Sequence, residues 1–216
     1  MEKYVSPEAV RVLGVLIEKE LSTPEYYPMT LNALVNGCNQ KSNRNPVVEY
    51  GEFQIREYLD ELQRLRLVGH ASVAGSRSEK FRHASAQYWS LGTKEMAIMA
   101  SLMLRGPQTV GELRARTSRM AEFEDIEEVS ERLDQLATRD EPLVVSIGRL
   151  PGQKGERFAH LLEGPGAIEA LIAAGASGGV GLSVGAVAGL REELEEMRTR
   201  LSGLEEKFEA FRNQFE

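Results

Sequence analysis

The sequence predicts an α+β protein, mainly α-helical, in which a unit of three helices and a β-hairpin occurs twice before a linker and a long amphipathic helix. Two observations carry this prediction. The nonapeptide GSRSEKFRH at residues 75–83 returns as GQKGERFAH at residues 152–160, with Gly, Glu, Phe and His at identical places. The sequence around both copies also repeats, and residues 187–215 place hydrophobic side chains at alternating spacings of three and four.

The first helix of each unit is expected to begin at a capping residue. Ser6 followed by Pro7 is a typical helix start, because serine can accept a hydrogen bond from the first turn and proline suits the first helical position. In the second copy Thr93 is the expected cap. The buried stripe of that second helix is expected to contain Met96, Met99, Ala100 and Met103.

The remaining elements of each unit follow in the same order. Second helices are expected after Thr30 and Thr109, each of which can cap a helix. Third helices are expected around the matching segments LDEL at residues 59–62 and LDQL at residues 133–136. After each third helix a Leu-Val pair opens a strand, the nonapeptide forms the far side of a hairpin, and YWSL or AHLL closes it.

Three helices with a two-stranded hairpin make a winged helix, a helix-turn-helix variant that usually presents its third helix to a DNA major groove. We therefore expect two tandem winged-helix domains at residues 1–92 and 93–164, a Gly/Ala-rich linker at 165–185 and a C-terminal coiled-coil helix at 186–216. Residues 170–190 are uncharged over a length that suits a membrane span, but their glycines and sparse apolar side chains favour a flexible linker and no membrane contact.

The C-terminal helix is expected to form a homodimer. In a parallel pair two of its flanking charge pairs are complementary, Glu193 with Arg198 and Arg200 with Glu205, whereas Lys207 opposite Arg212 is not. An antiparallel pair, and a single amphipathic helix folded back onto the two domains, remain open. In sedimentation a chain ending at Gly166 should be a monomer where the full chain forms a larger species, and the same oligomeric state for both would leave the fold-back standing. The predicted hydrophobic seam contains Val187, Leu190, Leu194, Met197, Leu201, Leu204, Phe208, Phe211 and Phe215.

Three segments resemble the YceH family, uncharacterised bacterial proteins with tandem winged helices. They are TLNALVNGCNQKSNRNPV at 30–47, PQTVGELRART at 107–117 and LPGQKGERFAHLL at 150–162. The resemblance covers roughly residues 6–164, and the stretch CNQKSNRNP is its most specific part. It implies the fold but no activity, because the family has no established biochemical role.

Composition and charge exclude a strongly basic nucleic-acid-binding chain. The chain is 42% hydrophobic and 27% charged, with a net charge of −7. That charge divides into 0 for residues 1–92, −3 for residues 93–163 and −4 for residues 164–216, so any phosphate-facing surface must come from local clusters. The single Cys38 excludes an intrachain disulfide, and with no apolar signal segment at the N-terminus we expect a cytoplasmic protein.

The segment between the second and third helices of the first copy is expected to contact double-stranded DNA. Its side chains suit phosphates and base edges, and they include Asn39, Gln40, Lys41, Asn43 and Arg44. The alternative is structural, with these side chains satisfying the backbone of a turn that Pro46 ends. Other basic residues lie in the two hairpins and between the second and third helices of the second copy. They could contact phosphates or be ordinary solvated charges. They are Arg77, Lys80, Arg82, Arg114, Arg116, Arg119, Lys154 and Arg157.

The third helix of the second copy argues against DNA contact there. Residues 122–139 carry a balance of −5, which would repel phosphates and which suits a protein partner instead. Two functions therefore stay open: a DNA-binding or transcription-regulatory protein, and an interaction scaffold that resembles the segregation and condensation protein B class. We expect no enzyme, cofactor or metal, because Cys38 has no partner ligand and His83 and His160 are expected beside core phenylalanines on strands.

Overall fold

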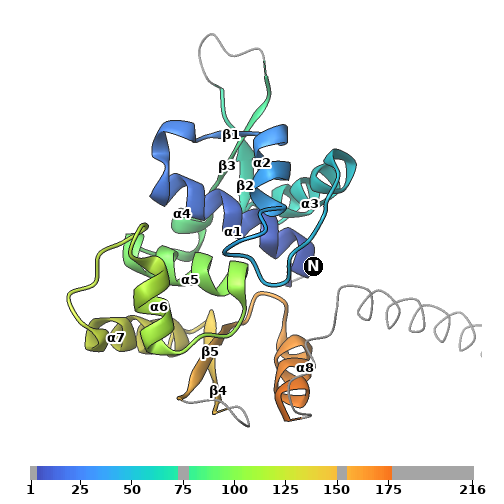
Figure 1. Cartoon of the computed structure of the whole chain (residues 1–216). Helices are drawn as coiled ribbons and strands as arrows, with labels where there is room; N and C mark the ends of the chain where they lie inside the picture. Colours follow the sequence, from blue (N-terminus) through green and yellow to red (C-terminus); the bar gives the residue numbers. More distant parts are fainter. Residues whose placement is uncertain (1–3, 73–77, 150–154, 177–216) are drawn as a thin grey trace, which may run out of the picture. The chain divides into compact units, whose positions relative to one another are not determined.

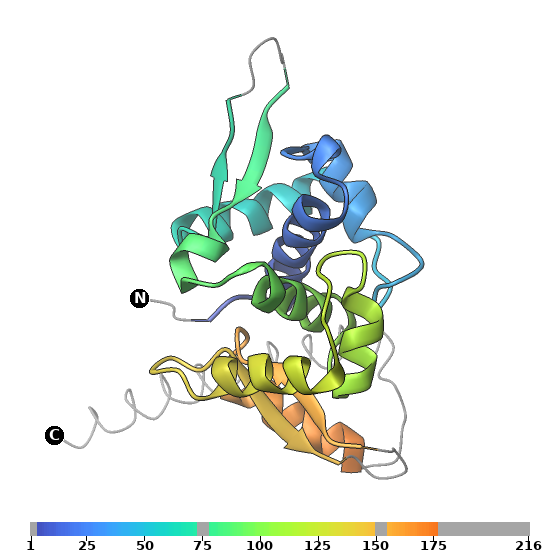
Figure 2. The same ribbon diagram turned by 90° about the vertical axis from the view of Figure 1, so that its left-hand side faces the viewer.

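The computed structural model describes residues 4–72, 78–149 and 155–176 (Figures 1 and 2). All of these residues belong to one compact unit, residues 1–179. The protein is mainly α-helical with two small antiparallel sheets, so the predicted α+β class is confirmed. The expected coiled-coil helix, with its seam from Val187 to Phe215, lies outside the described residues and stays a prediction.

In the first half, short local signals begin the helices as the sequence predicts. The Ser6 hydroxyl accepts a hydrogen bond from the Ala9 N–H at 3.2 Å, and the Thr30 hydroxyl accepts one from the Ala33 N–H at 3.3 Å. One antiparallel sheet has the strand order β1-β3-β2. The elements are α1 (Pro7–Ser22), η1 (Pro24–Tyr26), β1 (Met29–Thr30), α2 (Leu31–Cys38), α3 (Glu52–Arg64), β2 (Val68–His70), β3 (Lys80–His83) and α4 (Ser85–Trp89).

The second half repeats the order of three helices and two strands. Thr109 and Glu112 form the expected reciprocal cap: the Thr109 N–H donates to Glu112 Oε2 at 3.0 Å, and the Glu112 N–H donates to the Thr109 hydroxyl at 3.2 Å. Gly92, rather than Thr93, occupies the capping position of the first of these helices. The elements are α5 (Thr93–Arg105), α6 (Val110–Thr117), α7 (Ile126–Ala137), β4 (Val144–Gly148) and β5 (Arg157–His160).

Three elements differ from the sequence prediction. The YWS of YWSL, expected to close the first hairpin, lies in and directly after α4, where Trp89 is buried and Ser90 ends the turn in a left-handed conformation. The two-residue strand β1 adds a third strand to the first sheet. The first part of the expected linker forms α8 (Pro165–Ala176), since proline suits a helix start and alanine has the highest helix propensity.

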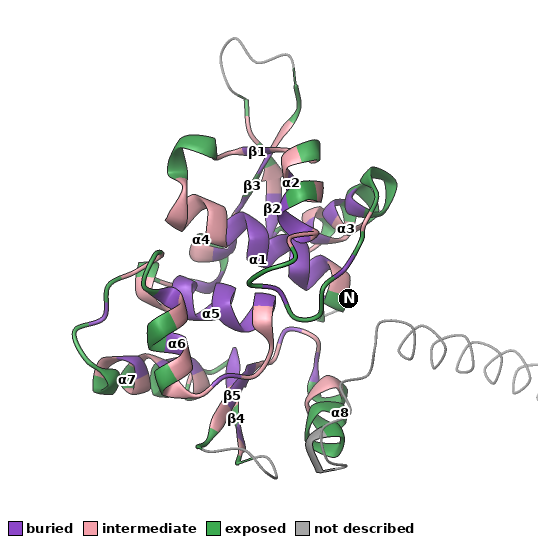
Figure 3. Cartoon of the chain, in the orientation of Figure 1, coloured by how far each residue is buried: buried purple, intermediate pink, exposed green. Residues whose placement is uncertain are grey.

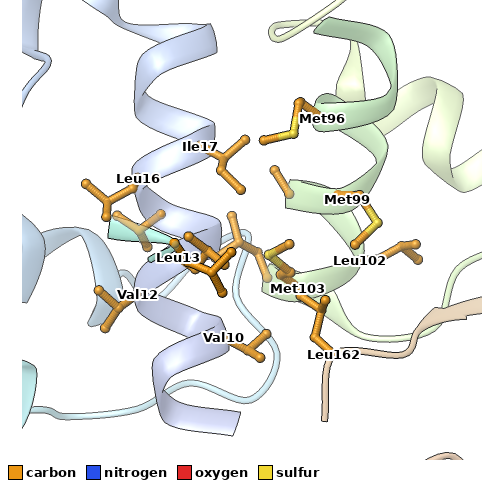
Figure 4. Close-up of a cluster of buried hydrophobic side chains, with 14 of the residues drawn as sticks. Val10, Val12, Leu13, Leu16, Ile17, Met96, Met99, Leu102, Met103 and Leu162 are labelled. Carbon is orange, nitrogen blue, oxygen red and sulfur yellow. The ribbon is translucent and has the colours of Figure 1, made fainter. Parts of the chain in front are cut away.

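One hydrophobic core joins the two halves. The apolar faces of α1 and α5 pack against each other, and Leu162 closes the cluster from the chain after β5 (Figure 4). Gly14 permits this close approach, because a Cβ atom there would lie 3.0 Å from Met103 Cβ. Buried positions accordingly concentrate along α1 and α5 (Figure 3). The repeat is thus visible in the order of elements, whereas the packing is continuous between the copies.

The outer helices and the hairpins pack around this pair. α3 packs on α1 and α7 packs on α5, so the two equivalent third helices lie at different sides of the core (Figure 1). The N-terminal segment also bonds to the second half, where the Val5 N–H donates to Leu162 O at 2.8 Å. Within the part of the chain that the structure describes, no helix combines the length and the apolar character that crossing a membrane requires.

Candidate functional site

The segment between α2 and α3, predicted as a DNA contact, is held largely by bonds inside the protein. The Asn39 amide pairs with the Tyr50 backbone in both directions, each bond 2.8 Å long, and closes the segment into a loop. Arg11 of α1 reaches the same loop and donates to Pro46 O at 2.8 Å. This arginine was not among the sequence candidates, although it interrupts an otherwise apolar run in the first helix.

Arg44 is the most buried of the predicted DNA contacts. Its side chain is 0% exposed, and its two Nη atoms donate to both oxygens of Glu18 at 3.0 and 2.6 Å. Its Nε donates to Gly37 O at 3.1 Å. A guanidinium bound in this way stabilises the loop and has no exposed surface to offer a phosphate. Of its sequence neighbours Lys41 is exposed and Gln40 is half-buried.

The tip of the loop joins the first half to the second. Asn43 adopts a left-handed conformation with φ of 62°, which asparagine tolerates better than most residues. Its side-chain oxygen accepts a hydrogen bond from Arg105 Nη2 at 2.9 Å. The Asn45 N–H donates to Leu104 O at 2.9 Å, which fixes the loop against the last turn of α5.

A pocket of about 320 Å³ lies where this loop meets the second half. Its wall comes from five places: the loop tip, the end of α5, the connection from α5 to α6, the helix α6 and the strand β5. Figure 1 shows the loop descending from α2 to the end of α5 beside α6. Neither α3 nor α7 contributes a lining residue. The lining consists of Asn43, Arg44, Asn45, Arg105, Pro107, Glu112, Arg116 and Arg157.

The arginines of the pocket outnumber its carboxylates. Arg157 and Arg116 share the one carboxylate of the lining, at 2.8 Å and 3.3 Å from the two oxygens of Glu112. Burial favours the neutral acid, but the Thr109 N–H and the two arginines outweigh it and hold the pKa of Glu112 below its ordinary value. Arg157 also donates to Pro107 O at 2.8 Å, which fixes the position of its guanidinium.

Arg105 was missed in the sequence analysis. It is the last residue of α5. Among the described residues its guanidinium forms no ion pair, and the one hydrogen bond of its side chain goes to the uncharged Asn43 amide. Burial lowers the pKa of Arg105, and the nearby charges of Arg116 and Arg44 lower it further. The only sequence signal was a basic residue directly before the Gly-Pro that ends the helix. That position alone could not reveal its neighbours.

The structure therefore gathers only some of the predicted contact residues. Asn43, Arg44, Arg116 and Arg157 meet at the pocket, whereas Lys80 and Arg82 lie on β3 of the other half. On β3 they alternate with the buried Phe81 and His83 and thus face away from the core. Of the other candidates, Arg114 donates to Glu124 O at 2.9 Å and Arg119 is exposed, while Arg77 and Lys154 are outside the described residues.

The side chains considered for metal binding or catalysis lie in structural positions. Cys38 is buried, which raises the pKa of its thiol to about 12 and keeps the thiolate nucleophile from forming. His83 Nε2 lies 2.6 Å from Glu20 Oε2; burial lowers the pKa of His83 and Glu20 opposes that shift. Burial lowers the pKa of His160 to about 4. Within residues 4–72, 78–149 and 155–176, no cluster of His, Cys, Asp and Glu could hold a metal ion.

Fold and pocket together define a mainly α-helical protein with a duplicated unit of helices and hairpin and an arginine-lined pocket between the two copies. The chain belongs to the DUF480 family, described as "Protein of unknown function", which it matches over residues 5–153. It is 42% identical over 215 residues to the UPF0502 protein azo0627 of Azoarcus sp. (strain BH72), covering 98% of this chain and 94% of the relative.

Other relatives carry the same designation. A UPF0502 protein of Geobacter metallireducens is 44% identical over 220 residues, covering 100% of both chains. The UPF0502 protein Acid345_3645 of Koribacter versatilis is 49% identical over 162 residues, covering 75% of each chain. The resemblance of the sequence to the uncharacterised YceH-like proteins is thereby confirmed. The names of these relatives state no activity.

Proposed function

We propose that this protein binds double-stranded DNA through its first half and regulates transcription, as a pair of tandem winged-helix domains. The repeated order of three helices and a hairpin supports the proposal, because it is the order of a helix-turn-helix variant whose third helix enters the major groove. The proposal includes a homodimer formed by the tail, which would set the distance between two DNA contacts. It assigns no catalytic step.

The observation that carries this proposal is the difference between α3 and α7. The outward side of α3 exposes Arg56 and Arg64, and the exposed Arg66 follows directly after the helix. No lysine or arginine of α7 is exposed, while Glu127, Glu131 and Asp134 are. Phosphates would therefore be attracted to the arginines of α3 and repelled by α7.

Three acids on α3 set the expected strength of binding. Glu52, Glu57 and Asp60 are exposed on the same helix, so three exposed acids against two exposed arginines give the helix a net exposed charge of −1. The outward side of β3 adds Lys80 and Arg82. Three to five phosphate contacts correspond to a slope of about −2.7 to −4.5 in a plot of log affinity against log salt concentration. We expect weak binding that salt suppresses steeply.

Fluorescence anisotropy with a random DNA duplex tests this proposal. Reversing two charges of α3, Arg56→Glu with Arg64→Glu, is expected to weaken binding roughly tenfold or more, because phosphate attraction becomes repulsion. The matched control is Arg114→Glu with Arg119→Glu, which changes the net charge equally in the second half. Absence of binding at low salt, or an equal loss in the control, would contradict the proposal.

A second candidate function follows from the surface of α7. Glu124, Glu127, Glu131 and Asp134 are exposed there beside Ile126, whose side chain is 42% exposed. An apolar side chain within an acidic surface suits a basic protein partner, as in an interaction scaffold. Unlike the first candidate, this function requires no nucleic acid.

Charge reversal tests the scaffold candidate by affinity capture from the native bacterium. A partner that binds wild-type protein is expected to be lost with Glu124→Lys and Glu127→Lys, because both substitutions repel a basic surface. The control, Glu49→Lys with Glu57→Lys, changes the same charge in the first half. A partner that is retained by the α7 variant does not use this helix.

A further inference from the structure

We infer that the arginine-lined pocket binds a phosphate group with two negative charges, either inorganic phosphate or the phosphomonoester of a small molecule. The site is independent of the proposed DNA contact, because its lining contains no residue of α3. It takes Arg105, Arg116 and Arg157 from the second half and Asn43 from the first. A ligand there would touch both halves.

The charge count of the pocket calls for an anion. Among the described residues, four arginines line it, and two carboxylates neutralise part of their charge: Glu112 inside the lining and Glu18 behind Arg44. Two positive charges remain, which a dianion would match. Burial and, after it, the nearby charge of Arg116 lower the pKa of Arg105, and the same anion would relieve the repulsion between the two arginines.

The donors of the pocket suit phosphate oxygens. A guanidinium carries five N–H donors in a planar fork, which binds oxyanions in pairs of hydrogen bonds. In the hydrogen bonds of the described residues, Arg105 uses only Nη2, for Asn43, and Arg157 uses only Nη1, for Pro107 O and Glu112. Donors therefore remain available after the internal bonds are made.

The pocket is also fixed in place and large enough for more than an ion. The buried Arg44 and the bond from Asn45 to Leu104 hold the loop tip, while Pro107 O and Glu112 hold Arg157. Preformed donors avoid the entropic cost of ordering on binding. The volume of about 320 Å³ falls within the range of small-ligand pockets, which leaves room for an organic group beside the phosphate.

The test is calorimetric titration of the full-length protein at about pH 8, where a phosphate group carries nearly two charges. Inorganic phosphate is the first probe, with chloride at matched ionic strength as the background. We expect saturable binding that Arg105→Gln weakens roughly 10- to 100-fold, because one charge-assisted contact is lost. Arg105→Lys keeps the charge without the fork and should give an intermediate loss.

Two further probes identify the source of the phosphate group. Tighter binding of a 5′-mononucleotide than of inorganic phosphate would assign the pocket to a phosphorylated small molecule, and equal binding would assign it to the free anion. A dinucleoside phosphodiester has a single charge and should bind more weakly than either. Equal binding of the diester would overturn the dianion assignment.

The control variant is Arg119→Gln, which removes an exposed arginine outside the pocket. It should bind phosphate as the wild type does. No binding beyond the chloride background, or unchanged binding by Arg105→Gln, would overturn the inference. Loss of duplex binding in Arg105→Gln would also overturn it, since the pocket would then be the nucleic-acid contact; the α3 variant, in contrast, should keep its phosphate affinity.

Discussion

Replacing Arg44 with alanine is expected to lower the free energy of unfolding by about 3–5 kcal/mol. The Arg44 guanidinium is fully buried and binds both oxygens of Glu18, whose side chain is only 16% exposed. Alanine would leave that carboxylate without its main partner in a poorly solvated place. It would also remove the donor to Gly37 O, so the loop tip at the pocket should loosen. Urea denaturation followed by circular dichroism measures the change.

The exposed Lys41, three residues earlier in the same loop, provides the matched control. Lys41→Ala should change stability by no more than about 0.5 kcal/mol, as is usual for an exposed side chain. A cost below about 1 kcal/mol for Arg44→Ala would mean that the buried ion pair is not what holds the loop. If an Arg44 variant bound DNA weakly, the cause would therefore be the loosened loop and not the loss of a phosphate contact.

Leu13→Ala is expected to destabilise both halves of the protein by about 2–5 kcal/mol. Leu13 is fully buried in the cluster between α1 and α5, so a smaller side chain leaves a cavity that the packed helices can fill only in part (Figure 4). Because that cluster is shared, unfolding should remain one cooperative transition. Amide hydrogen exchange should show equal losses of protection in α3 and in α7.

The exposed Leu171 of α8 allows the same substitution outside the core. Leu171→Ala should change the free energy of unfolding by no more than about 0.5 kcal/mol, because the side chain is 37% exposed. If Leu13→Ala removed protection from α3 and left α7 protected, the two copies would be independent folding units. The proposed boundary between residues 92 and 93 would then separate two domains that fold independently, and not only two repeats of the same order of elements.

Local signals explain how much of the fold the sequence predicts. Ser6, Thr30 and Thr109 cap helices because each side-chain hydroxyl meets an N–H only three residues away. The hairpin strand that contains Phe81 and His83 was predictable because side chains on a strand point alternately to the core and to solvent. YWSL was assigned wrongly, since α4 depends on the burial of Trp89, which the aromatic pattern of a strand does not distinguish.

The candidate site was predicted only in part, for a reason of distance along the chain. Arg116 and Arg157 appeared in the sequence as basic residues of two separate elements, and nothing local joined them through Glu112. Arg105 showed only its position before the Gly-Pro that ends the helix, and its partner Asn43 lies 62 residues away in the sequence. The sequence suggested a surface position for Arg44, because Glu18, which pairs with its guanidinium inside the protein, lies 26 residues earlier.

The sequence by itself determined the duplicated order of helices and strands, since caps and periodic apolar positions act over a few residues. Only the tertiary structure decided that α1 and α5 share one core, that Arg44 is internal and that the remaining arginines form a pocket. A charge becomes buried or free according to which distant groups pack around it. For Arg44 the distant group is Glu18 of the same half, whereas the pocket needs both halves, because its lining combines Asn43 with Arg105, Arg116 and Arg157.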